Sequence, residues 1–518
     1  MKFTSRSFLA MLAIAVGSIG VGWTGVVAAD QEVGAKIDPK SCLGCHLDKN
    51  PGIASQYQGS AHARNDVSCE DCHGASETDL DAWKHEGTFI ATIVTPKDCG
   101  ECHDAETSEF EASHHAKAGN ILHSLDNLLA EVVEGHRGEW EIPDPHKPGS
   151  KLKINGMAFA NSGCHQCHGS QVALIDVDGK SVTPWTLKQP SGGGLAVVTY
   201  DSSLVDPARV KRDEQGRPVI DSKTWPNTGI GRMNLDGSRG SCTACHSRHD
   251  FSNRRARQPE NCGKCHLGPD HPQKEVYDES KHGIAYRDMK DKLSLESKSW
   301  VLGKDYNGAP TCATCHMSAT RNQGITHDPR NRISWNNRPP ASVRLDTDEH
   351  GTVVTDPAKI KSSWQDKRDN MKDVCGNCHS PKYVESFYNQ YDDFVNLYNA
   401  KYAEPGKKLM KALLENKLIT KADFDEKIEW TWFFLWHHEG RRGRHGVSMM
   451  APDYSHWHGT FEVADRWYNE MVPEAREIIE EAKKDTAKKA GAEKVEAVLD
   501  EILAAPEHQY TTTGKMPE

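Results

Sequence analysis

The stretch Cys42-Leu-Gly-Cys45-His46 is the first of eight C-x-x-C-H motifs, which together use all 16 cysteines of the 518-residue chain. The others are CEDCH at 69–73, CGECH at 99–103, CHQCH at 164–168, CTACH at 242–246, CGKCH at 262–266, CATCH at 312–316 and CGNCH at 375–379. C-x-x-C-H is the attachment motif of c-type haem, in which both thiols form thioethers with the porphyrin and the following imidazole binds the iron. We number the motifs 1 to 8 along the chain and expect one haem c at each.

The predicted ligands of these eight haems follow directly from the motifs. Thioether bonds are predicted for Cys42, Cys45, Cys69, Cys72, Cys99, Cys102, Cys164, Cys167, Cys242, Cys245, Cys262, Cys265, Cys312, Cys315, Cys375 and Cys378. The first axial ligands are predicted to be His46, His73, His103, His168, His246, His266, His316 and His379. Because haems claim every thiol, we expect no disulfides, although cysteine-rich exported domains usually form them.

Paired C-x-x-C motifs also bind zinc, and this chain has enough of them for four such sites. Zinc coordination does not require a histidine directly after the second cysteine. Histidine is 27 of 518 residues, so eight such histidines in a row would arise by chance with odds on the order of 10^-10. The motifs therefore favour haem over zinc.

The amino terminus is typical of a secretory signal peptide. Lys2 and Arg6 precede an apolar run over 8–27, and small residues follow at Ala28 and Ala29. This order predicts cleavage after residue 29 rather than a retained membrane anchor, and no later segment has the eighteen or so apolar residues of a membrane span. We therefore expect an exported protein. Its net charge of -11 disfavours nucleic acid and anionic membranes as partners and permits a basic electron carrier.

The motifs divide the mature chain into two regions. All eight lie within 30–380, the predicted octahaem-binding region, where an apolar content of only 36 % overall implies that haems supply much of the core. The gap at 170–240 is rich in Gly, Pro, Asp and Ser, and it predicts an irregular insertion with one hairpin near 195–200. The region 381–518 shows helical periodicity at 383–402, 407–418, 424–438, 461–485 and 493–503. The expected fold is a mostly α multihaem cytochrome c, with long C-terminal helices and few short strands.

A short repeat identifies candidates for the second axial ligands. Its pattern is an aromatic residue, two residues, Ser, one residue, His and a small residue, and it occurs at 57–63, 110–116 and 277–283. We assign its histidines, His62, His115 and His282, as sixth ligands. His249 and His327, each close behind a motif, are the next candidates. The remaining ligands are sought at His437 or His438, with His438 preferred, and at one of His85, His123, His136 and His445.

Two further segments carry possible chemistry. Gly268-Pro-Asp270-His271-Pro holds a carboxylate beside an imidazole between two prolines, which predicts a rigid proton-accepting pair; an N-cap at the start of a helix is the alternative. The second is Met449-Met-Ala-Pro-Asp-Tyr454-Ser-His-Trp-His-Gly459, preceded by a His- and Arg-rich run at 436–445 whose arginines could pair with haem propionates.

With these residues the chain resembles the octahaem hydroxylamine oxidoreductases, including the hydrazine dehydrogenases of anaerobic ammonium oxidisers. The resemblance rests on the eight motifs, the Gly-Pro-Asp-His-Pro segment and the Asp-Tyr-x-x-Trp-His-Gly segment, and it spans nearly the whole mature chain. It implies a homotrimer whose motif 4 haem is catalytic and crosslinked to Tyr454 of a neighbouring subunit as a P-460 type cofactor. It also implies that Asp270 and His271 are the distal acid–base pair. Met317 is a candidate for a third residue of that pocket.

The implied function is oxidation of hydroxylamine to nitric oxide or nitrite, with electrons passing through seven bis-histidine haems to a c-type cytochrome or similar acceptor. Hydrazine dehydrogenation to dinitrogen is the main alternative, because the motifs do not separate the two substrates. Reduction of nitrite or hydroxylamine, and electron transfer without a substrate, remain weaker alternatives. The expected compartment is the periplasm or, in an anaerobic ammonium oxidiser, the lumen of the anammoxosome.

Overall fold

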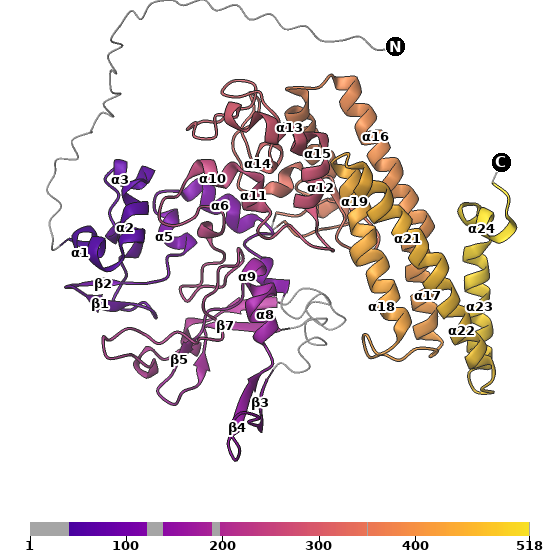
Figure 1. Ribbon diagram of the computed structural model, residues 1–518, viewed down its shortest axis with the longest axis horizontal. Helices are drawn as coiled ribbons and strands as arrows, with labels where there is room; N and C mark the ends of the chain where they lie inside the picture. The colour runs from indigo at the N-terminus through magenta and orange to yellow at the C-terminus, as the bar shows by residue number, and fades with distance from the viewer. Residues whose placement is uncertain (1–40, 122–137, 189–196, 350, 517–518) are drawn as a thin grey trace, which may run out of the picture.

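The computed structural model describes residues 41–121, 138–188, 197–349 and 351–516. The predicted signal peptide, 1–29, lies outside these residues, as do His123 and His136. Figure 1 shows two parts that differ in texture. The part that carries the motifs consists of short helices, hairpins and irregular connections, and the remainder is a bundle of long helices. This division agrees with the expected mostly helical multihaem fold.

The motif-bearing part contains many short helices. The α-helices are α1 (Cys42–Lys49), α2 (Pro51–Gln58), α3 (Ala61–Arg64), α4 (Glu70–His73), α5 (Pro96–Gly100), α6 (Asp104–Ala112), α8 (Ala158–Ser162), α9 (Cys164–His168), α10 (Asn253–Arg257), α11 (Pro259–Cys262), α12 (Gln273–Glu279), α13 (Lys281–Met289), α14 (Cys312–His316) and α15 (Trp364–Gly376). The 3-10 helices are η1 (Ala118–Ile121), η2 (Ser202–Leu204), η3 (Pro207–Arg209), η4 (Cys242–Ala244), η5 (Lys290–Lys292), η6 (Pro329–Arg332) and η7 (Pro357–Lys359).

The strands form separate antiparallel hairpins rather than one sheet. They pair as β1 (Trp83–His85) with β2 (Thr88–Ile90), β3 (Glu139–Pro143) with β4 (Lys151–Asn155), β5 (Leu174–Ile175) with β6 (Ser181–Val182), β7 (Trp185–Lys188) with β8 (Val197–Tyr200), and β9 (Trp335–Asn336) with β10 (Val343–Arg344). The insertion at 170–240 therefore holds two hairpins where one was expected. Strands β5 and β6 have two residues each, too few to show an alternating pattern.

The C-terminal helices overlap every predicted helical segment, with bounds that differ by a few residues. They are α16 (Pro381–Tyr398), α17 (Glu404–Glu415), α18 (Lys427–Phe433), α19 (Gly440–Ser448), α20 (Pro452–Ser455), α21 (Glu462–Asp465), α22 (Val472–Lys483), α23 (Lys489–Leu503) and, after the 3-10 turn η12 (Pro506–His508), α24 (Gln509–Thr513). The π-helical turns η8 (Asn399–Ala403), η9 (Phe434–Glu439), η10 (His456–Phe461) and η11 (Arg466–Met471) join them into rods. Across the described ranges, no helix combines the length and apolar character needed to cross a membrane.

Two of these rods run through residues that normally interrupt helices. Pro405 lies in the first turn of α17, directly after a π turn, where its missing N–H is not needed. In α19, Gly443 lies against Gly459, and Gly446 lies against the backbone of Tyr454, where a Cβ atom would clash. Because these glycines permit close packing, the helix predicted to end at residue 438 continues to Ser448.

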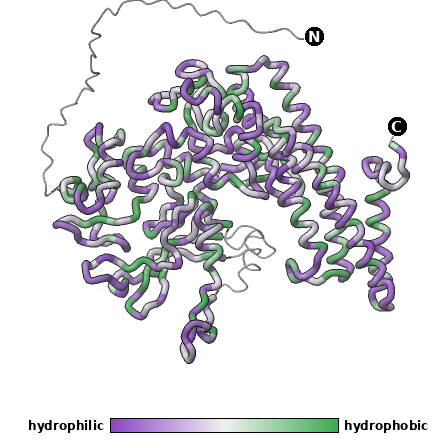
Figure 2. The backbone as a smooth tube through the Cα atoms, viewed as in Figure 1, coloured by the Kyte–Doolittle hydropathy of each residue, from purple (hydrophilic) through white to green (hydrophobic). Residues whose placement is uncertain are grey.

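The two parts are stabilised differently. Side chains of α17, α18 and α21–α23, with those of the π turns η8, η9 and η11, form one large apolar core around Trp467, which is fully buried. Figure 2 shows the matching alternation of hydrophilic and hydrophobic residues along these helices. The motif-bearing part has several smaller clusters instead. This contrast fits the low apolar content of the chain, because haems supply apolar surface in the motif-bearing part.

Replacing Trp467 by Ala should therefore destabilise the helical bundle without changing haem content. Truncating a large buried aromatic residue costs about 3–5 kcal/mol, and we expect that loss in the free energy of unfolding measured by circular dichroism. The control is Leu397→Ala, because Leu397 is 54 % exposed and such a change usually costs within about 0.5 kcal/mol. Equal losses in the two variants would contradict the assigned core.

Candidate functional site

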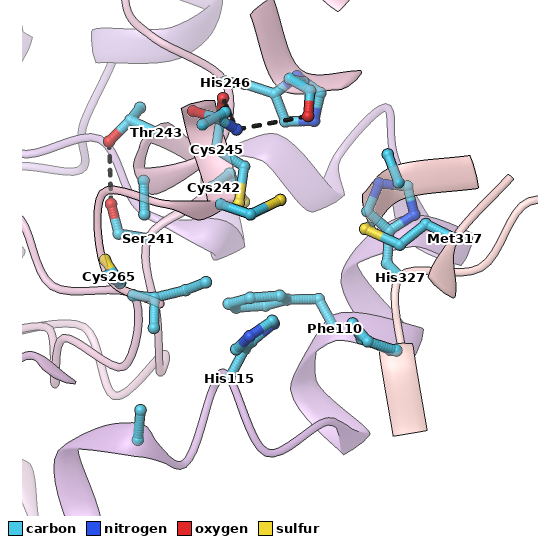
Figure 3. A pocket seen from close by; sticks show the side chains of 18 of the residues that line it. Phe110, His115, Ser241, Cys242, Thr243, Cys245, His246, Cys265, Met317 and His327 are labelled. Carbon is cyan, nitrogen blue, oxygen red and sulfur yellow. Dashed lines mark hydrogen bonds between the residues drawn. The ribbon is translucent and has the colours of Figure 1, made fainter. Parts of the chain in front are cut away.

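The motifs line one continuous cavity of about 3400 Å³. Every motif contributes its histidine and at least one cysteine to the lining. Ordinary small-molecule sites have volumes of about 300–1,000 Å³, so this cavity is several times larger than one substrate requires. Its size and its lining of thiols and imidazoles fit a set of covalently attached haems. Figure 3 shows part of it, where cysteines of motifs 5 and 6 surround Phe110 and His115.

Six motif histidines face a second histidine across this cavity. The pairs, with the distances between ring centres, are His46–His85 at 6.2 Å, His73–His249 at 6.4 Å, His103–His62 at 6.3 Å, His246–His327 at 6.5 Å, His266–His115 at 6.1 Å and His379–His282 at 6.0 Å. The five leading candidates for sixth ligands each lie in one of these pairs, and His85 completes the sixth.

These distances are those that an iron between two imidazoles would impose. A histidine nitrogen lies about 2 Å from a bound transition metal, and the centre of its ring lies about 1 Å farther away. Two axial imidazoles on one iron therefore have ring centres about 6 Å apart. The spacing fits haem iron at six positions. The facing nitrogens of each pair would be about 4 Å apart, which is too far for a direct hydrogen bond.

The repeated sequence unit positions three of these histidines by the same local device. Ser60 and Ser280 are buried N-caps whose hydroxyls accept from the backbone N–H groups of Ala63 and Gly283. Ser113 makes the equivalent contact at a turn, where its hydroxyl accepts from the N–H of His115. An N-cap fixes the direction in which a helix begins, so a histidine two residues later has a defined orientation.

Motifs 4 and 7 are not among these pairs. Within the described residues, no second histidine ring lies opposite His316. His438, the preferred candidate among the remaining residues, contacts Phe433, Phe434 and His437 rather than a motif histidine. Burial lowers the pKa of His438 to about 4, so its ring is uncharged at neutral pH. Its role as a ligand stays a prediction.

Contacts between thiols give the order of the motifs in space. The thiols of Cys99 and Cys242, of Cys262 and Cys312, and of Cys167 and Cys265 lie close to each other. Those of Cys42 and Cys69, Cys72 and Cys99, Cys245 and Cys262, and Cys315 and Cys375 lie close enough to interact electrostatically. The motifs therefore follow the order 1, 2, 3, 5, 6, 7, 8, and motif 4 joins this line at motif 6.

The Asp270–His271 pair lies just behind motif 6, in a cluster of buried basic side chains. Asp270 Oδ1 is 3.2 Å from His271 Nδ1, and Asp270 Oδ2 is 3.8 Å from Arg441 Nη1 and 4.0 Å from His437 Nε2. Helix α12 begins at Gln273 with Pro272 as its N-cap and no side-chain cap, so Asp270 is not a helix cap. The role of the pair as a proton acceptor stays a prediction.

A third polar side chain of this cluster, Gln273, is missed by sequence reasoning. Its Oε1 lies 3.4 Å from Nδ1 of His266, and its Nε2 lies 3.3 Å from Nε2 of His445. Burial, followed by the neighbouring Arg444 and Arg441, lowers the pKa of His445 to about 3. Gln273 thus links a motif histidine to an uncharged imidazole of α19. A glutamine at the start of a helix carries no sequence signal for such a role.

The arginines at 441–444 have partners within the protein. Arg444 is fully buried, and its guanidinium donates to the carbonyls of Gly440, Pro339 and Trp436. Arg442 forms ion pairs with Glu439 and Glu462. These contacts give both arginines a structural role in holding the C-terminal helices, where pairing with haem propionates had been considered.

Tyr454 lies on α20, where it is half-buried and packs against Gly446 of α19. Within its own chain its side chain neighbours His458 and the charged groups of Glu275, Glu279 and Arg442, rather than motif 4. The adjoining Met450, Trp457 and Phe461 are exposed. Met317, the candidate for a third residue of the pocket with Asp270 and His271, lies beside His327, which faces the histidine of motif 5 (Figure 3).

Replacing His282 by Ala should leave one haem without its second imidazole. We expect a high-spin signal to appear at the expense of one low-spin signal, because a six-coordinate iron loses an axial ligand. Electron paramagnetic resonance measures this change. The control is His146→Ala, because His146 lies exposed between strands β3 and β4. A fully loaded H282A protein with an unchanged spectrum would show that His282 is not a ligand.

Comparisons with known proteins agree with the haem interpretation. A family model described as "Seven times multi-haem cytochrome CxxCH" matches residues 231–425, and one for "Cytochrome c554 and c-prime" matches residues 26–74. A "Probable nitrite reductase-hydroxylamine oxidoreductase fusion protein" of Kuenenia stuttgartiensis is 23% identical over 402 residues. That match includes 70% of this chain and 36% of the fusion protein, so the chain spans about a third of the length of its relative.

Two solved structures share the fold. A "Hypothetical multiheme protein" is 24% identical with a TM-score of 0.64, and the match covers 87% of this chain and 97% of the other. The reducing HAO-like protein complex of Kuenenia stuttgartiensis is 19% identical with a TM-score of 0.53, covering 85% of each chain. These matches show a multihaem cytochrome fold, which agrees with the motifs and with the cavity that they line.

Proposed function

We propose that the chain carries eight haems c and oxidises hydroxylamine, to nitric oxide or nitrite, at the haem of motif 4. The observation that carries this proposal is the position of Asp270 and His271. They follow motif 6, and motif 6 contacts motif 4 through the thiols of Cys265 and Cys167. All of these groups line the same cavity. A proton-accepting pair therefore shares its cavity with motif 4.

Cys164, Cys167 and His168 would hold the haem of motif 4, which would supply a redox-active iron that accepts electrons one at a time. The protein residues would bind and orient the substrate and take up its protons. The Asp270 carboxylate can accept a proton from the substrate nitrogen or oxygen, and His271, 3.2 Å away, can receive it. Arg441 and His437 lie beside the same carboxylate and hold it in place.

The other seven haems would conduct electrons away from the reaction centre. Oxidising hydroxylamine releases several electrons, whereas one haem stores one, so neighbouring acceptors are required. Six of the seven have two facing imidazoles in the structure, which fits carriers that bind no substrate. Motif 4 lies beside motif 6, from which the line of motifs continues to motif 5 on one side and to motif 7 on the other. We propose a c-type cytochrome or similar carrier as the final acceptor.

We also propose that the protein is an exported homotrimer with an intersubunit bond between Tyr454 and the motif 4 haem. Tyr454 is half-buried, and its segment exposes the apolar side chains of Met450, Trp457 and Phe461. Apolar groups that gather at a surface favour burial against another protein. Tyr454 has no contact with motif 4 of its own chain among the described residues, so such a bond requires a second copy.

Hydrazine oxidation to dinitrogen is the alternative at the same site, since the same residues would bind either molecule and accept its protons. The reductive direction is a second alternative, because one protein of similar fold is named a reducing HAO-like complex. Steady-state assays separate the three. The proposal requires faster turnover of hydroxylamine than of hydrazine with an oxidised cytochrome, and little nitrite reduction with a reduced dye.

Replacing Tyr454 by Phe removes the oxygen that would form the crosslink. We expect loss of a red-shifted absorption band in the reduced protein and loss of hydroxylamine oxidation, with the other haem bands unchanged. Tyr510→Phe is the matched control, since Tyr510 is exposed on the terminal helix α24. If Y454F kept both the band and the activity, Tyr454 and the crosslink would have no part in the reaction.

A further inference from the structure

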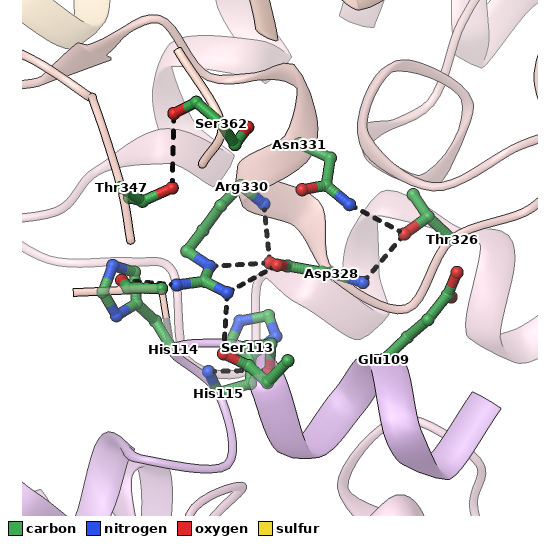
Figure 4. Close-up of polar contacts among 12 residues, drawn as sticks. Glu109, Ser113, His114, His115, Thr326, Asp328, Arg330, Asn331, Thr347 and Ser362 are labelled. Atoms are coloured by element: carbon green, nitrogen blue, oxygen red, sulfur yellow. Dashed lines mark hydrogen bonds and ion pairs between the residues drawn. The ribbon is translucent and has the colours of Figure 1, made fainter. Parts of the chain in front are cut away.

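A buried ion pair lies between motifs 5 and 6 and has no role in the mechanism above. Arg330 in η6 contacts Asp328 at two points, with Nε 2.8 Å from Oδ1 and Nη2 2.6 Å from Oδ2. Both side chains are more than nine-tenths buried. A two-point contact of this kind fixes both position and orientation. Figure 4 shows the pair at the centre of a group of polar contacts.

This ion pair connects the two segments that carry His115 and His327. Arg330 Nη2 also donates to the carbonyl of Ala112, at 2.6 Å, where helix α6 ends and the turn with His115 begins. Asp328 directly follows His327, whose backbone N–H donates to Glu109 of α6 at 2.6 Å. The same two residues therefore hold His115 opposite His266 and His327 opposite His246.

The charges of the pair also act on one of these rings. The Asp328 carboxylate and the Arg330 guanidinium both interact electrostatically with His115. Charges in a buried site are weakly screened, so their effect is much larger than at a surface. The two charges therefore act on the His115 ring in opposite directions.

We propose that Asp328 and Arg330 are positioning residues for the distal imidazoles of haems 5 and 6, and that their opposed charges set the reduction potential of haem 6. This inference rests on the proposed axial ligands. Its consequence for electron flow follows from the contact between motifs 4 and 6: haem 6 is the neighbour to which an electron leaving motif 4 passes first.

The two charges predict shifts in opposite directions. Without Arg330, the carboxylate is uncompensated and favours the ferric state, so the potential of haem 6 falls. Without Asp328, the guanidinium is uncompensated and favours the ferrous state, so the potential rises. A purely structural role would loosen the same turn in both cases and would shift the potential in one direction.

The experiment is a redox titration of the haem-loaded protein followed by electron paramagnetic resonance, with the variants Arg330→Gln and Asp328→Asn. His115→Ala identifies the signal of haem 6, because that variant removes its distal ligand. Arg330→Lys retains the positive charge and should keep a potential near that of the unmodified protein. The matched control is Arg368→Gln, which breaks another buried ion pair, with Asp392 at 2.7 Å, and should leave the haem 6 signal unchanged.

Opposite shifts for R330Q and D328N, with little change in R330K, support the inference. Equal shifts in the same direction, or no shift in either variant, overturn it. If R330Q fails to fold, D328N and R368Q are compared alone. An upward shift of the haem 6 potential in D328N, without such a shift in R368Q, then supports the inference, and any other result overturns it. If H115A retains every low-spin signal, His115 is not an axial ligand and the proposed ligand set is wrong. That result is distinct from the potential shifts that test the role of the ion pair.

Discussion

Two imidazoles that face each other with ring centres 6.0 to 6.5 Å apart form the contact on which the rest of this structure depends. An iron fits between such rings, and the flat macrocycle around it fills space that side chains would occupy in other proteins. The motif-bearing part accordingly has a cavity of about 3400 Å³ and small apolar clusters around it. Several of its short helices carry a thiol or an imidazole that lines the cavity.

The C-terminal helices are stabilised by side-chain packing rather than by cofactors. They form an ordinary apolar core around Trp467, and one rod of the bundle ends in α19, whose glycines admit the Tyr454 segment at close range. Arg441, on the same helix, reaches Asp270 behind motif 6. The bundle thus fixes one wall of the cavity, and it holds the Tyr454 segment against α19. A rigid support of this kind suits a site whose groups must keep their distances while electrons pass.

Sequence could predict those features that have a local pattern. The motifs fix one axial histidine of each haem, and the repeat around Ser60, Ser113 and Ser280 identifies three partners because each serine positions a histidine two residues away. His85 has no such repeat: it lies on a short strand, and its partner is fixed by how β1 meets α1. Long-range pairing of this kind is set by tertiary packing rather than by neighbours in sequence.

The features that sequence could not predict are contacts between distant segments. Arg330 reaches the end of α6, and Gln273 reaches α19; neither has a composition or spacing that marks it. The line of motifs, with motif 4 joining at motif 6, also emerges only from thiol contacts in the folded chain. Iron positions in crystals of the haem-loaded protein, located by anomalous scattering, test the account most directly. The account predicts eight iron sites, six of them midway between the paired imidazoles; iron atoms elsewhere, or imidazole pairs without iron between them, would contradict it.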